Sequence, residues 1–215
     1  MNYSEKHFGR RGRGSAKQNE RMQVLEKRIS DNHDDVEALL EKGFLCIGGP
    51  FMSPEEATEC LGRVIELEPD NTEARFWLAK TYYHEFCDEN KTRTVLEEAV
   101  KIDPFRADCH TFLASILYYE FNQKTLAENH YKKAIELEPN WPFPRISLIR
   151  YLIKERRLDE ARKEIKQAMC TVNKTIKPEI KTDYDSYYEN CVTGRAGIDK
   201  EWLEEMKDEI EELEG

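Results

Sequence analysis

Three copies of one short phrase decide the fold: VIELEP at 64–69, AVKIDP at 99–104 and AIELEP at 134–139. The closing prolines are at positions 69, 104 and 139, so the phrase recurs every 35 residues. Proline lacks an amide hydrogen and its ring clashes with the preceding turn, so each phrase ends a helix. An interval of this length suits a unit of two helices, and the sequence therefore predicts a helical repeat.

A second pattern follows each proline. Aligned on the prolines, ARFWLAKTYY at 74–83 and DCHTFLASILYY at 108–119 place a Leu-Ala pair at the same point, Ala79 in one copy and Ala114 in the next. Two helices that pack about 8–10 Å apart need a small residue on one side. The same register puts Gly43 in the small position of an earlier copy.

Together these positions resemble the tetratricopeptide repeat family, in which a small residue in the first helix is followed by an alanine opening the second, a large residue and a closing proline. The matching residues are Gly43, Ala57, Leu61 and Pro69; Ala79, Thr92, Leu96 and Pro104; Ala114, Ala127, Tyr131 and Pro139; and Ile149, Ala161 and Ile165. The resemblance covers about 34–170. It implies an all-α, right-handed superhelical solenoid of helix-turn-helix repeats with helical caps.

Two features depart from the family pattern. The position that often holds tryptophan in the family is occupied by Leu39, Arg75, His110 and Arg145. The first three units are also slightly longer than the usual length of about 34 residues. We place the surplus in the turn inside each unit, because the second helix keeps its spacing to the proline.

The chain divides into three predicted parts. Residues 1–17 form a basic tail with the arginine-glycine stretch FGRRGRGS, which we expect to be disordered. Residues 18–172 form the solenoid, with a capping helix followed by about four repeats. Residues 173–215 are predicted to be acidic capping helices that shield the open end of the stack. The expected helix pairs of the repeats are 34–47 with 54–68, 72–87 with 90–103, 107–121 with 124–138, and 142–155 with 158–171.

Composition restricts the function. The net charge of −10 argues against a general binder of nucleic acid or anionic membranes and favours a basic partner. No stretch approaches the roughly 18 apolar residues of a membrane span, and the first residues lack the apolar core of a secretion signal. We therefore expect a cytoplasmic protein, with a nuclear one as the alternative, whose six cysteines are reduced.

Metal binding and catalysis find little support in the sequence. His84 and Cys87 share a helix face, and Cys109 and His110 follow in the next unit. By residue type these four side chains could bind zinc. These pairs lie at opposite ends of parallel helices, roughly 20 Å apart at 1.5 Å per residue. No histidine has a nucleophile in a recognisable elbow. The sequence thus predicts neither an enzyme nor a cofactor or metal site.

The family resemblance implies that the first helix of each unit lines a concave groove. Carried over, it gives these peptide-binding residues: Phe44, Glu73, Phe76, Trp77, Lys80, His84, Asp108, Phe112, Tyr119, Phe143 and Arg150. Aromatic rings dominate the set. Phe76 and Trp77 point about 100° apart, so at least one is expected to be partly exposed or to cover the next unit.

These residues predict a non-catalytic interaction module that docks an extended or helical segment of a partner protein. Trp77 and Phe112 are the expected anchors, and Glu73 and Asp108 would select basic residues. Two alternatives stay open. One is an assembly chaperone or holdase for a basic client, acting through the acidic surface. The other is an RNA-associated adaptor acting through the basic tail. The rest of the chain is not expected to bind nucleic acid.

Overall fold

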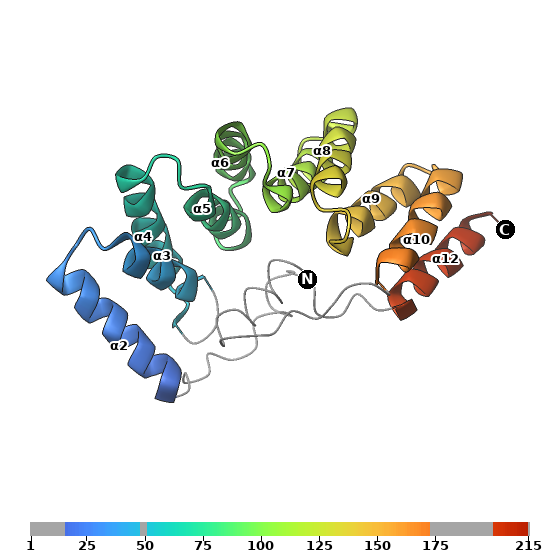
Figure 1. Cartoon of the computed structure of the whole chain (residues 1–215). Helices are drawn as coiled ribbons and strands as arrows, with labels where there is room; N and C mark the ends of the chain where they lie inside the picture. The colour runs from blue at the N-terminus through green and yellow to red at the C-terminus, as the bar shows by residue number, and fades with distance from the viewer. Residues whose placement is uncertain (1–15, 48–50, 173–199, 215) are drawn as a thin grey trace. The chain divides into compact units, whose positions relative to one another are not determined.

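The computed structural model describes residues 16–47, 51–172 and 200–214, and these residues fold into α-helices with no β-strand among them. The helices are α2 (Ala16–Asp31), α3 (Val36–Leu45), α4 (Pro54–Leu67), α5 (Thr72–His84), α6 (Glu89–Ile102), α7 (Ala107–Tyr119), α8 (Lys124–Leu137), α9 (Pro142–Lys154), α10 (Leu158–Val172) and α12 (Lys200–Glu214). The chain divides after Ile102 into two compact units. Figure 1 shows successive helices paired within each unit.

The first unit contains two helical hairpins, α3 with α4 and α5 with α6, and α4 packs against α5. Asp35 and Asn71 cap α3 and α5, because each side-chain oxygen accepts a hydrogen bond from the backbone amide three residues on. Gly43 brings α3 close to α4: a Cβ atom there would lie 2.9 Å from Cγ of the buried Leu61. The small position that the sequence identified is therefore a point of close helix contact.

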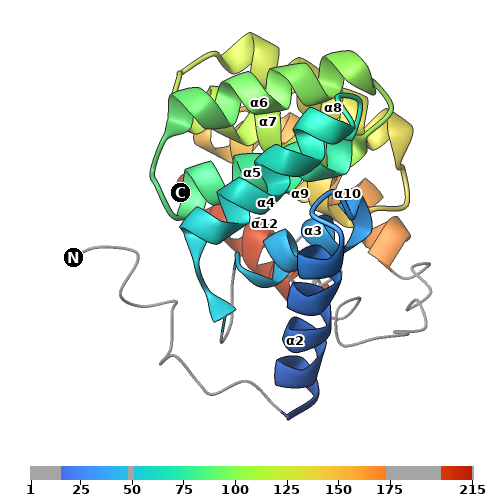
Figure 2. The same cartoon turned by 90° about the vertical axis from the view of Figure 1, so that its left-hand side faces the viewer.

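Helix α2 lies against the first hairpin. It packs on α3, and Figure 2 shows the two helices side by side. Met22 and Leu25, three residues apart on one face of α2, are buried. The guanidinium of Arg28 donates two hydrogen bonds of 2.9 Å to Asp35, which joins α2 to the capping residue of α3.

The second unit repeats the arrangement with the hairpins α7 with α8 and α9 with α10. Helix α8 packs against α9, and α12 packs against α10. Trp141 is buried at the start of α9 against Ala107 of α7 and Ala134 of α8. Leu203, Met206 and Ile210 form the buried stripe of α12. Residues 173–199 of the predicted capping helices lie outside the described residues, as do residues 1–15 of the tail.

The turns inside three hairpins share one backbone device. Cys87, Asn122 and Arg156 have positive φ angles of 49°, 52° and 58°. Each follows the first helix of its hairpin. After Cys87 and Asn122, the next amide donates back to a carbonyl six residues earlier, at 2.9 Å and 2.8 Å. This left-handed closure reverses the chain between the two helices.

Candidate functional site

Three of the predicted peptide-binding aromatics are buried. Phe44, Phe76 and Trp77 are 1%, 3% and 1% exposed. Trp77 fills the space between the first helices of the two hairpins, with its ring edge-on to Phe44 at a centroid distance of 4.6 Å. Neither ring is therefore exposed; Trp77 instead covers Phe44 of the neighbouring repeat, the other arrangement that the sequence allowed, and it is not accessible as an anchor. The ring faces inside the protein because α3 and α5 lie close enough for it to bridge them.

The remaining predicted residues of the first unit lie around this cluster. Nζ of Lys80 is 5.8 Å from the Phe76 centroid and 5.6 Å from that of Trp77, so the cation covers the two rings. Glu73 is half-buried near the start of α5, and His84 is exposed at its end. These three polar residues do not converge on a cavity that the structure describes.

In the second unit, two predicted residues serve the fold. Asp108 accepts hydrogen bonds from the Arg106 guanidinium, with Nε at 3.1 Å from Oδ1, so its charge is already paired. Phe143 stacks on Trp141 at 5.8 Å and packs against the buried cluster between α7 and α8. Phe112 is half-buried on α7.

Tyr119 and Arg150 do come together. Both line a cavity of about 240 Å³ bounded by the end of α7, by α9 and by α12. The other lining residues are Ile153, Lys154, Glu205, Met206 and Glu209. Tyr119 is 47% exposed, and Nζ of Lys154 lies 4.4 Å from its ring centroid. The cavity thus joins two residues that the sequence placed on the inner face with five that it did not.

The cavity has walls of opposite charge. Arg150 and Lys154 are one turn apart on α9, and Glu205 and Glu209 are one turn apart on α12. Within the described ranges 16–47, 51–172 and 200–214, no ion pair joins Lys154 to either glutamate. The spacing of four residues in each helix is a signal that the sequence contains. The sequence does not show that α12 packs where its two glutamates meet the two cations of α9 at one cavity.

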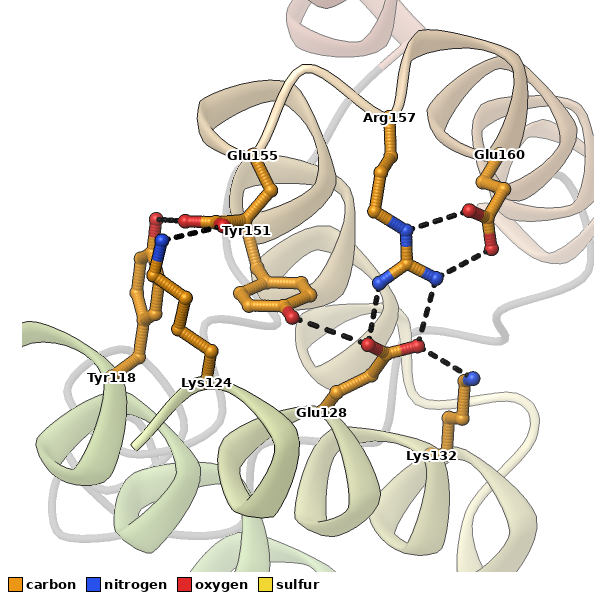
Figure 3. A network of polar contacts seen from close by, with 8 residues as sticks. All are labelled: Tyr118, Lys124, Glu128, Lys132, Tyr151, Glu155, Arg157 and Glu160. Atoms are coloured by element: carbon orange, nitrogen blue, oxygen red, sulfur yellow. Dashed lines mark hydrogen bonds and ion pairs between the residues drawn. The ribbon is translucent and has the colours of Figure 1, made fainter. Parts of the chain in front are cut away.

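A polar network fixes the neighbouring face of α9 (Figure 3). Glu128 of α8 accepts hydrogen bonds from both terminal nitrogens of Arg157, one of them 3.1 Å long, and a 3.1 Å bond from the Tyr151 hydroxyl. Nζ of Lys132 lies 2.6 Å from the same carboxylate. The hydrogen bonds from the Arg157 guanidinium lower the pKa of Glu128 to about 2, although burial of the carboxylate acts in the opposite direction.

A second carboxylate ties α7 and α8 to the end of α9. Glu155 accepts a 3.0 Å hydrogen bond from the Tyr118 hydroxyl and a 2.7 Å bond from Nζ of Lys124. The Lys124 ammonium lowers the pKa of Glu155. Because Tyr151 and Glu155 face the network, α9 turns Arg150 and Lys154 toward the cavity.

Neither a metal centre nor a membrane span is found in the part of the chain that the structure describes. No three histidine, cysteine, aspartate or glutamate side chains gather there as a metal site would need. None of the described helices is long and apolar enough to cross a bilayer.

Comparison with known proteins supports the repeat assignment. Residues 107–140 match the model of the tetratricopeptide repeat family. No curated protein matches the chain. Similar solved structures include MamA, with a TM-score of 0.62 and 22% identity over 71% of this chain and 87% of that one. They also include YrrB, described as a TPR protein with an unusual peptide-binding site, with a TM-score of 0.60 and 18% identity over 89% of this chain and 93% of that one.

A third similar structure is TTC0263, a thermophilic TPR protein in Thermus thermophilus, with a TM-score of 0.57 and 20% identity over 79% of this chain and 87% of that one. These likenesses concern the fold. They confirm the predicted all-α helical-repeat architecture, and residues 107–140 are similar to a tetratricopeptide repeat.

Proposed function

We propose that this tetratricopeptide-repeat protein is a non-catalytic interaction module that binds a segment of a partner protein at the cavity of the second unit. The observation that carries the proposal is the convergence of Tyr119 and Arg150 on that cavity. Tyrosine and arginine are the residue types that most often dominate binding energy at interfaces. The similar structure of YrrB, which is described as having a peptide-binding site, adds support at the level of the fold.

The chemistry of the cavity defines the kind of segment that fits. Tyr119 offers exposed apolar contact above the buried Ile153 and Met206, while cations and carboxylates flank them on α9 and α12. A ligand residue that is apolar would pack on these side chains, and neighbours of opposite charge would pair with the two walls. The proposed ligand is therefore a segment in which an apolar residue lies between an acidic and a basic one.

Affinity selection tests the proposal. Peptides are selected from a display library on the full chain, and their dissociation constants are measured by fluorescence anisotropy. Tyr119→Ala should weaken binding about 30-fold, since truncating a central interface aromatic costs about 2 kcal/mol. Phe86→Ala is the matched control, because Phe86 of the first unit is 43% exposed and does not line the cavity.

Two results would speak against this function. If no selected peptide binds the full chain, the module does not take short segments. If Tyr119→Ala and Phe86→Ala leave the affinity equally unchanged while circular dichroism stays helical, binding takes place elsewhere.

One further candidate has an observation in its favour. Helix α12 exposes several carboxylates outside the cavity, among them Asp208, Glu211 and Glu212, on a chain of net charge −10. This supports a holdase for a basic client. Polylysine is a suitable probe: its binding should fall steeply with added salt, because attraction between exposed charges is screened. Binding of a cavity peptide through Tyr119 should respond much less.

A further inference from the structure

Two histidines meet inside the α7–α8 hairpin. Nδ1 of His110, a residue that is 7% exposed on α7, lies 2.8 Å from Nδ1 of His130 on α8. Nε2 of His110 lies 3.1 Å from the carbonyl oxygen of Pro104, in the turn before α7. The ring centroids are 5.1 Å apart. His110 thus connects α8 to the proline that closes a repeat.

The hydrogen-bond partners assign the protons. A carbonyl oxygen only accepts, so Nε2 of His110 carries a hydrogen and donates it to Pro104. In neutral His110, Nδ1 is then the acceptor, and Nδ1 of His130 must be the donor. One additional proton on Nε2 of His130 leaves this arrangement intact. A second additional proton has to occupy Nδ1 of His110, where two N–H groups would face each other at 2.8 Å with no acceptor between them.

The neighbouring hairpin shows what replaces this pair. Arg75 occupies the position 35 residues before His110, and its Nε lies 3.5 Å from Glu98 of α6. Lys133 stands 35 residues after Glu98. The hairpin that carries the histidines therefore has a lysine where the preceding one has the carboxylate, so that position cannot pair with a charged His110.

We propose that the α7–α8 hairpin is a proton-sensitive element, in which the bond between His110 and His130 persists with up to one added proton and breaks with two. Breaking it releases the contact between α7 and α8 that also positions the Pro104 turn. Because α7 ends at Tyr119, acidification would loosen the hairpin that supplies one wall of the cavity. The geometry of the pair carries this inference and does not depend on the ligand.

The charged groups that act on His110 lie on α8, on the turn before α7 and on α7 itself. Lys133 faces it from α8, Asp103 from the preceding turn, and Asp108 from α7 itself, where Arg106 pairs with it. Burial is the main cause that lowers the pKa of His110, and the charge of Lys133 lowers it further. The Pro104 carbonyl, Asp108 and Asp103 act to raise it. The net direction is toward the neutral ring, in agreement with the proton assignment.

An NMR titration of the full chain tests the proton assignment without any mutation. In spectra that correlate ring nitrogens with ring protons, His110 should show the Nε2–H tautomer at neutral pH. Between pH 8 and pH 5 the pair should gain one proton, and a second should enter only as the α7 and α8 signals shift together. Two independent titrations near 6.5, the ordinary value for histidine, would overturn the proposal.

A stability measurement tests the consequence. The unfolded chain takes up both protons near pH 6.5 and the folded pair takes one, so acid favours unfolding. For one withheld proton, the unfolding equilibrium constant should rise roughly 25-fold between pH 7 and pH 5. The triple variant His110→Arg, His130→Val, Lys133→Glu copies the residues found 35 positions earlier, Arg75, Val95 and Glu98.

This variant should lose that contribution, because it holds an arginine and a carboxylate in place of the pair; His84, whose pKa is lowered to about 4, adds the same rise to both proteins. An equal rise in both proteins would refute the inference. If the variant does not fold, the NMR titration of the natural chain decides.

Discussion

The carboxylate of Glu128 gives the sharpest stability prediction. It accepts hydrogen bonds from Arg157 and Tyr151, its side chain is 14% exposed, and its pKa is lowered to about 2 from an ordinary value of 4.5. At about 1.4 kcal/mol for each unit of pKa, this difference corresponds to about 3 kcal/mol between the charged and the neutral side chain. Glu128→Gln removes the charge and should lose about that much stability at pH 7.

The sign of the pH dependence follows from the lowered pKa. The stabilisation is fully present above the unfolded pKa near 4.5 and is lost as pH falls toward 2. At pH 3 the difference between the natural chain and Glu128→Gln should therefore shrink to about 1 kcal/mol. Urea denaturation followed by circular dichroism at 222 nm measures both values.

Glu136→Gln is the matched control, because it makes the same chemical change on the same helix. The Glu136 side chain is 70% exposed and lies 3.6 Å from Lys133, so its removal should change stability by less than about 0.5 kcal/mol. The reasoning fails if the two variants lose the same stability at pH 7. It also fails if the gap between them is unchanged at pH 3.

Three further predictions concern other residues. Gly43→Ala should cost about 1–3 kcal/mol, because the new methyl would lie 2.9 Å from a buried leucine. Gly62→Ala, where nothing lies within 4 Å, should gain about 0.5–1 kcal/mol, and urea denaturation that ranks the two alike would contradict the close helix contact at Gly43. Trp77→Ala should lower the free energy of unfolding by about 3–5 kcal/mol because the ring is 1% exposed. If stability is unchanged and peptide binding is lost, Trp77 is a binding residue instead. Cys87 is exposed and should be alkylated by iodoacetamide in the folded chain, whereas Cys109 is buried with a raised pKa and should react only on unfolding, as peptide mapping would show.

The sequence predicts the fold well because the repeat signals are local. A proline that ends a helix and a small residue that permits close contact act on their immediate neighbours. The predicted first helix 72–87 is present as Thr72–His84, shortened where the left-handed Cys87 turns the chain. The surplus residues were expected in this turn, which forms the bend between α5 and α6.

The candidate site depends on contacts that a single sequence does not contain. The rings of Phe76 and Trp77 belong to one helix, and their directions follow from its geometry. Whether α3 lies near enough for Phe44 to cover Trp77 depends on packing between hairpins. The cavity at Tyr119 likewise needs α12, a helix recognisable by its apolar stripe but with no sequence signal for the place it docks.

The left-handed residues at the bends leave room for engineering. Cys87 and Arg156 hold a backbone conformation that costs a side-chain-bearing residue about 1 kcal/mol and that glycine adopts freely, while Asn122 tolerates it better. Neither Cys87 nor Arg156 lines the cavity. Arg156 is better kept, because it donates a 3.3 Å hydrogen bond to the Leu213 carbonyl of α12. Glycine at position 87 would make a more heat-resistant scaffold on which the recognition surface could then be redesigned.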